Sequence, residues 1–559
     1  IRDRVGADVG KGKDASPREV PTKNFRAFYR GLDDAVEGLY HDELLTLADD
    51  GKTPDFGFDS RIFERAAEWV RERGGFTPSM LQEQPARDVI DETFRILGGA
   101  VSSSISEEMP AELTGLLENN AFIFSGLKTY HSLNEVGLSL IGDDGGIKPF
   151  EKFHEDVARI DAKYNRNYLY AEYNHAVTSS QMATKWYDFQ QDGDRYNLQY
   201  RTANDERVRE EHQRLHNITL PVSDPFWEQF MPPNGWNCRC VVVQVRKGRY
   251  PESDSQQAVG IGEEITEEPK KRIFRFNPGK ELKVFPDKHP YNKAPQKTKE
   301  QILQLAKERF SAKTIEEAEQ QFRDILGINC RLDGFKKKDI AQVKDIFDCV
   351  ERHFRDFPEL KSKIKFVGSM TGRVNLLAEA KYKELKPLYP NALDSAVRDA
   401  AKKWARKVAY LKDCYAYSSE GCEQYGANGL VFNTAWAGDK IAESLKRDVQ
   451  YKFHPIACDT VKAVFDHELG HKIDALLGLR KDAEFLKIFR EAVVHGEQYI
   501  IDNLSHYAYD SRRIRKPNYT PEAEFIAEAW SEYLNNPQAR EIATAVGKLI
   551  EKKCGKLKR

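Results

Sequence analysis

One short stretch restricts the fold of this chain more than any other, the sequence Asp466-His-Glu-Leu-Gly-His471. Apolar residues recur three or four positions apart around it, which predicts an α-helix. These residues are Val461, Phe465, Leu469, Ile473 and Leu476. We expect the helix to begin after Asp459 or Thr460, either of which is a good N-cap residue, and to end near Gly478.

Two histidines on this predicted helix have the spacing of metal ligands. His467 and His471 are four residues apart, so their imidazoles share one helical face. Glu468 lies beside them, in position for proton transfer. The pattern is typical of zinc peptidases. The alternative is that the two histidines are ordinary polar residues on a helix that binds no metal. We predict Zn²⁺ ligands at both histidines and a catalytic base at Glu468.

A third ligand is needed, because catalytic zinc usually takes three protein ligands and keeps one position for water. Thr520 and Pro521 predict the start of a second helix. Glu524 and Glu528 then share one face of it, so we predict Glu524 as the third ligand. Glu528 is expected to hold the second ring nitrogen of a ligand histidine. Asp474 is another candidate for that supporting role.

Residues 467–478 and 524–528 together resemble the catalytic core of the anthrax lethal factor type of gluzincin, a family of zinc peptidases. The resemblance implies a zincin-like fold, a Zn²⁺ cofactor with the three ligands and the base given above, and a protein or peptide substrate. That family also has a tyrosine shortly before the third ligand, which stabilises the oxyanion or acts as an acid. Tyr507 matches this position best, with Tyr519 as the alternative.

A second distinctive block ends in Cys238-Arg-Cys240 and contains His212 and His216 upstream. Two cysteines and a histidine can bind a metal ion. Zinc sites usually have at least two residues between their cysteines, however, so buried thiols in a small loop-rich core explain the pattern equally well. His212, Cys238 and Cys240 are therefore either a structural metal site or a core group.

This block closely resembles the bacteriophage Mu F-like head-morphogenesis domain, the minor head protein family. Arg201-Thr-Ala203, Asp224-Pro-Phe-Trp227 and the run from Pro232 to Cys240 carry the resemblance, and residues 173–183 resemble the helix that precedes them. The resemblance extends over about residues 22–250. It implies a component of a phage or prophage head, with portal and head proteins as partners. The location would be the virion, or the bacterial cytoplasm during assembly.

These observations predict an α+β fold that is mainly helical. A Pro-, Gly- and Ser-containing stretch after the Cys-x-Cys block has the composition of a linker. We expect a flexible N-terminus over residues 1–21, a Mu F-like domain with a small loop and β module over 22–250, a linker over 251–300, and a metallopeptidase-like domain over 301–559.

Composition narrows the classes of partner. Lys and Arg number 86 against 88 Asp and Glu, so the formal net charge of −2 gives no global attraction to nucleic acid, which we expect to be an incidental partner. No apolar run approaches the roughly 20 residues that cross a bilayer, so we expect no membrane partner. The first 20 residues lack the apolar core of a signal peptide, so we do not expect secretion by that route.

Family resemblance also suggests how the two halves belong together, because Mu F-like domains occur fused to C-terminal enzymatic domains in phage-encoded polymorphic toxins. The favoured hypothesis is a minor head protein that carries a packaged zinc metalloendopeptidase as an effector, with an immunity protein as a further partner. The alternatives are a head-maturation protease and a structural minor capsid protein with an inactive metal site.

Overall fold

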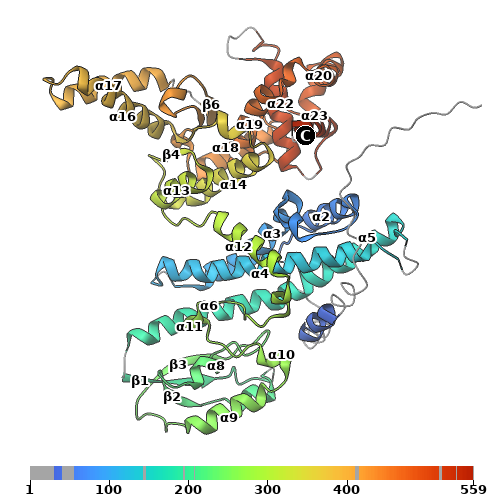
Figure 1. Cartoon of the computed structure of the whole chain (residues 1–559), viewed down its shortest axis with the longest axis vertical. Coiled ribbons are helices and arrows are strands. Elements are labelled where there is room, and N and C mark those ends of the chain that lie inside the picture. Colours follow the sequence, from blue (N-terminus) through green and yellow to red (C-terminus); the bar gives the residue numbers. More distant parts are fainter. Residues whose placement is uncertain are drawn as a thin grey trace, which may run out of the picture. The chain divides into compact units, whose positions relative to one another are not determined.

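The computed structural model (Figure 1) divides into two compact units, residues 1–307 and 308–559. The residues that it describes are 31–40, 56–106, 108–142, 146–192, 195–206, 208–409, 414–514, 519–536 and 538–557. The expected flexible N-terminus, residues 1–21, lies outside them. Helices dominate both units and each unit has one small sheet, so the predicted mainly helical α+β class is confirmed.

Long helices form most of the first unit. α3 packs against α2, α4 and α6, and α4 also packs against α5. Asp59 caps the start of α2 by accepting a hydrogen bond from the backbone of Arg61, and Gly74 ends that helix in the left-handed conformation. The bounds are α2 Ser60–Arg73, α3 Gln84–Ser104, α4 Ala111–Ser139, α5 Phe150–Asp161 and α6 Leu169–Gln191.

A buried ion pair joins two of these helices. Lys128 of α4 contacts Glu172 of α6, and both side chains are at most 1 % exposed. The hydroxyl of Tyr40 donates a hydrogen bond to the other carboxylate oxygen of Glu172 at 2.8 Å. Burial lowers the pKa of Lys128 and raises that of Glu172, so each charge depends on its partner.

An antiparallel sheet of three strands, in the order β2-β1-β3, follows the long helices. Its strands are β1 Tyr196–Arg201, β2 Thr219–Pro221 and β3 Val241–Arg246. Short helices accompany it, α7 Glu210–Gln213, α8 Phe226–Phe230 and α9 Ser255–Ile265. Trp227, Phe230 and Tyr200 belong to a local core that also contains Cys238 and Cys240.

Residues 251–300, which we expected to be a linker, lie within the first unit instead. Phe285 stacks on Phe124 of α4 with ring centroids 3.8 Å apart, and Tyr291 is fully buried. The prolines that suggested a flexible segment begin short helices, α10 Pro269–Arg272 and α11 Pro278–Glu281. The composition was misleading because the intervening aromatic residues bury themselves in the core of this unit.

A mixed sheet of four strands, in the order β4-β5-β7-β6, lies in the second unit. β4, β5 and β7 are parallel to one another. β6 lies at one edge of the sheet and is antiparallel to β7. The strands are β4 Asn329–Arg331, β5 Phe366–Ser369, β6 Ala416–Ser419 and β7 Gly429–Phe432.

The helices of the second unit build its core around α19, which packs against α14 and α22. α16 and α17 form a helical hairpin in Figure 1. The bounds are α13 Ile315–Gln321, α14 Ile340–Asp356, α16 Met370–Leu388, α17 Asp394–Ala409, α18 Asp439–Gln450, α19 Val461–Leu477, α20 Ala483–His495, α21 Glu497–Asn503, α22 Pro521–Asn535 and α23 Glu541–Leu557.

Within the described part of the chain, no helix combines the length and apolar character that crossing a membrane requires.

The Lys128–Glu172 pair yields a prediction about stability. Lys128→Met leaves the carboxylate of Glu172 buried without a cation, so the free energy of unfolding of the first unit should fall by about 3–5 kcal/mol. Urea denaturation followed by tryptophan fluorescence measures the change. In Lys128→Met/Glu172→Leu both charges are gone, so this control should recover much of the loss. If Lys128→Met were as stable as the wild type, the prediction would be contradicted.

Candidate metal centre

Local capping fixes both helices of the predicted site. Thr460 accepts a hydrogen bond from the backbone of Ala463 at 3.1 Å at the start of α19, and Gly478 ends the helix with φ 66°. Thr520 is the N-cap residue of α22 and Pro521 is its first residue. The predicted starts of both helices and the predicted end of α19 are therefore confirmed.

A close helix contact brings the candidate ligands together. Gly470 of α19 faces Ala527 of α22, and a Cβ atom at position 470 would lie only 2.9 Å from the Cα atom of Ala527. A glycine is therefore required for this approach. Since Gly470 lies between the two histidines and Ala527 lies between the two glutamates, the contact sets one group of side chains against the other.

The three predicted ligands meet at one point. Glu524 Oε2 lies 3.3 Å from His467 Nε2 and 3.4 Å from His471 Nε2. Donor atoms about 2.0–2.1 Å from a tetrahedral zinc ion are about 3.3–3.4 Å from one another, so the separations fit that ion. Within the described residues Glu524 Oε2 is buried and accepts no hydrogen bond, as expected for an oxygen that faces a metal position. The residues present fit zinc.

The electrostatics of this group favour a cation. Burial by itself would raise the pKa of Glu524, but its contacts with His467 and His471 outweigh burial and lower the pKa to about 2. The carboxylate is therefore ionised at neutral pH, as a metal ligand must be. The nearby carboxylates likewise raise the pKa of His467 against the opposing effect of burial. The negative potential that raises it would also attract a metal cation, which would displace the proton from the imidazole on binding.

Glu528, which we predicted to hold the second ring nitrogen of a ligand histidine, lies beside His467. Its Oε1 atom lies 2.8 Å from His467 Nδ1, although outside the angular range of a hydrogen bond. Ser505 donates a hydrogen bond of 2.7 Å to Glu528 Oε2, and His454 Nδ1 lies 3.2 Å from Oε1. Sequence reasoning missed Ser505 and His454, since neither has a characteristic spacing to the motif.

Asp474, the other candidate for a supporting role, is engaged at the end of α19. It forms an ion pair of 2.6 Å with Arg480 and also accepts a hydrogen bond from the backbone of that residue at 3.1 Å. These contacts secure the turn after the helix, one turn beyond the candidate ligand His471. The structure therefore gives Asp474 a helix-ending function.

A cavity of about 370 Å³ opens beside the ligands, and Glu468 and Tyr507 both line it. The backbone N–H of Ser418 in the edge strand β6 donates a hydrogen bond of 2.7 Å to Glu468 Oε2. The ring centroid of Tyr507 lies 5.9 Å from that of His467. The alternative, Tyr519, donates its hydroxyl to the backbone carbonyl of Tyr507 at 3.1 Å, so its hydroxyl serves the loop.

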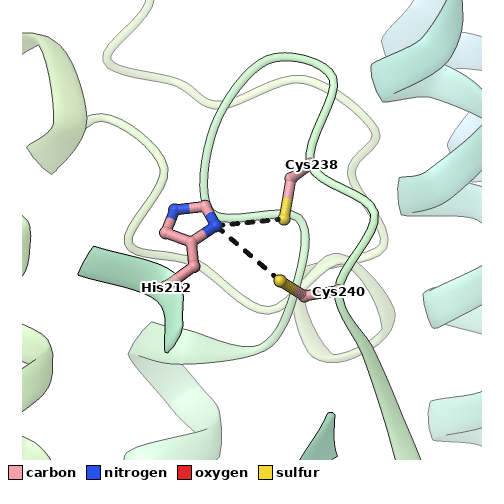
Figure 2. A group of neighbouring side chains, drawn as sticks. All are labelled: His212, Cys238 and Cys240. Carbon is pink, nitrogen blue, oxygen red and sulfur yellow. Dashed lines mark hydrogen bonds between the residues drawn. The ribbon is translucent and has the colours of Figure 1, made fainter. Parts of the chain in front are cut away.

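The Cys-x-Cys block forms a separate group in the first unit. Figure 2 shows the imidazole of His212 directed at the sulfur atoms of Cys238 and Cys240, with Nδ1 3.7 Å from each. All three side chains are buried. His216, which the sequence offered as a further donor, instead has Nδ1 2.9 Å from the hydroxyl of Thr202.

Comparison with known proteins identifies the class of this segment. Residues 146–243, which include α5, α6, β1, β2 and the start of β3, match the family model described as Phage Mu protein F like protein. The chain therefore contains a Phage Mu F-like domain, and the predicted resemblance is confirmed over these residues.

Two particular proteins share this segment. "Putative capsid assembly protein F" of Escherichia phage Mu is 39 % identical over 101 residues, which are 16 % of this chain and 23 % of that protein. "Mu-like prophage FluMu F protein" of Haemophilus influenzae (strain ATCC 51907 / DSM 11121 / KW20 / Rd) is 33 % identical over 98 residues, 15 % of this chain and 24 % of that protein. The matched part thus covers about a quarter of each relative. No solved structure matches the chain.

The support that Glu528 gives to His467 can be tested by metal affinity. Glu528→Gln removes the charge beside His467 Nδ1, so zinc affinity should fall by about 10–100-fold. Competition with a chromophoric chelator measures the change. Glu522→Gln, the same substitution six residues earlier on α22, is the matched control and should bind as the wild type does. Equal affinity in the two variants would contradict the assignment.

The helix contact at Gly470 gives a second prediction. In Gly470→Ala the new methyl group meets the backbone of α22, so the helices must separate and zinc affinity should fall at least about tenfold, with a stability loss of about 1–3 kcal/mol. Isothermal titration and thermal unfolding measure both effects. Gly99→Ala, at a helical glycine of α3 with open space around it, should leave zinc binding unchanged.

Proposed function

We propose that this chain is a phage or prophage minor head protein whose second unit is a zinc-dependent endopeptidase of the gluzincin type. Support for the first part is the Phage Mu F-like domain at residues 146–243 and the name of the phage Mu relative, a putative capsid assembly protein. Its partners would then be portal and head proteins, and its location the virion or the bacterial cytoplasm during assembly.

One observation carries the peptidase proposal. Side chains from two helices more than 50 positions apart in sequence place one carboxylate oxygen 3.3 Å and 3.4 Å from two imidazole nitrogens, beside a cavity that Glu468 also lines. This ligand set, two histidines and a glutamate with a neighbouring acid, is that of hydrolytic zinc sites.

Zinc held by these ligands would lower the pKa of its bound water to about 7. Glu468 would accept a proton from the attacking water and deliver it to the leaving amine. Ser418 fixes Glu468 Oε2 by a backbone hydrogen bond, which orients the carboxylate for this transfer. Tyr507 would donate its hydroxyl proton in a hydrogen bond to the developing oxyanion. Burial raises the pKa of Tyr507, so this hydroxyl remains protonated.

A peptide substrate suits the surroundings of the cavity. β6 is one of the two edge strands of its sheet, and Ala416 of this strand lines the cavity together with Tyr415. Ser418 directs its backbone N–H away from β7 and toward Glu468, so this edge of the strand faces the catalytic group. An extended peptide can bind by adding to such an edge.

The role that we favour is a head-packaged effector that cleaves proteins of the bacterial host, with an immunity protein as a partner in the producing cell. A head-maturation protease would have the same chemistry but would cleave neighbouring head proteins. A structural minor capsid protein with an inactive metal site is the third alternative. Cytoplasmic expression in bacteria separates the effector from the head-maturation protease. Only the effector should be toxic, and Glu468→Gln should abolish that toxicity.

The peptidase proposal predicts a separation of metal binding from catalysis. Glu468→Gln removes the base but none of the three ligands, so the variant should bind zinc as the wild type does. Its cleavage rate should be about 10²–10⁴-fold lower. Mass spectrometry of new N-termini after incubation with a bacterial lysate measures cleavage, and elemental analysis measures zinc.

Two controls complete this experiment. Glu522→Gln should cleave normally, and His467→Ala/His471→Ala should lose both zinc and cleavage. If the wild type binds zinc but produces no new N-termini in host lysate or in a preparation of phage head proteins, the inactive structural alternative replaces the proposal.

A further inference from the structure

A group of three donor atoms in the first unit belongs to none of the chemistry above. His212 comes from the short helix α7, whereas Cys238 and Cys240 come from the loop that leads into β3. The side chains converge although 26 residues separate the histidine from the first cysteine (Figure 2). Both cysteines are free thiols.

We propose that His212, Cys238 and Cys240 bind a thiophilic divalent cation of the zinc class. For a tetrahedral zinc ion with bonds of about 2.0–2.1 Å to nitrogen and 2.3 Å to sulfur, each nitrogen–sulfur separation is about 3.6 Å. His212 Nδ1 lies 3.7 Å from both sulfur atoms. The two separations are equal, as they would be around a shared ion, and one imidazole with two thiols is a ligand set that zinc prefers.

A second buried cluster, of Cys349, His353 and Asp466, lacks an imidazole nitrogen that is open to a metal ion. In the second unit His353 has Nδ1 2.8 Å from the carbonyl of Cys349 and accepts a hydrogen bond from Trp530 at Nε2, so strong protein partners occupy both of its nitrogens. His212 presents Nδ1 to two sulfur atoms, which are weak hydrogen-bond partners. A buried imidazole nitrogen in that position is better satisfied by a cation.

A fourth ligand for a tetrahedral ion would come from the cavity that one of the three donors borders. His212 borders a cavity of about 290 Å³ that Arg209, Glu211 and Lys271 also line. Water from this polar cavity can complete the coordination. The ion would join α7 to the loop before β3 and so hold the three-stranded sheet of a small, loop-rich core, which makes it a structural site. It lies within the segment that matches the Mu F-like family.

Cobalt substitution of the full-length protein tests this site separately from the proposed peptidase centre. Thiolate ligands give Co²⁺ a charge-transfer absorption in the near ultraviolet, and the three ligands proposed at His467, His471 and Glu524 include no thiolate. We expect about two metal ions per chain and this absorption in the wild type. Cys238→Ser/Cys240→Ser should lose one ion and the absorption, whereas His467→Ala/His471→Ala should lose one ion and keep the absorption.

Matched variants control for the substitutions themselves. Cys330→Ser changes a buried thiol in the second unit, and His216→Ala changes the neighbouring histidine, so both should keep the absorption that His212→Ala weakens. Absence of the band from cobalt-loaded wild type would overturn the proposal even if the cysteine variant does not fold. Persistence of the band in Cys238→Ser/Cys240→Ser would also overturn it.

Discussion

The close packing of α19 against α22 is the contact on which the candidate metal centre depends. The histidines lie on one helix and the glutamates on the other, so the distance between the helix axes decides whether four side chains can meet. Gly470 permits the short distance because it has no Cβ atom to meet Ala527. Leu469 and Phe525, both fully buried beside this contact, contribute the apolar area that holds the helices together.

A second set of interactions fixes the rotation of α19. Asp466, the residue before the first ligand, contacts Arg352 of α14 and accepts a hydrogen bond of 2.7 Å from Asn535 of α22. Burial would raise the pKa of Asp466, but the surrounding basic groups, Arg352 foremost, together outweigh burial and lower it to about 2. A buried charge of this kind tolerates little displacement, because its desolvation is compensated in only one geometry. The histidine face of α19 is thereby directed toward Glu524.

The parts of the site that sequence could predict are those with a local cause. Thr460, Gly478 and Thr520 mark helix ends through contacts within a few residues, and helical spacing alone places Glu524 and Glu528 on one face. Ser505 and His454 reach Glu528 only through the tertiary fold, and no spacing indicates them. The same distinction explains residues 251–300, whose composition suggested a linker although their aromatic side chains bury against distant helices.

Each proposed metal site lies wholly within one unit, and so does each hydrophobic core. The donors at His212, Cys238 and Cys240 share a core with the three-stranded sheet, whereas those at His467, His471 and Glu524 depend on the contact between α19 and α22. Neither geometry therefore requires a residue from the other unit. A Mu F-like domain that folds around its own core can be joined to a second unit with its own core, because exchange of the second unit leaves the first intact. Under the proposed function, the cavity beside β6 would determine which substrate the second unit cleaves.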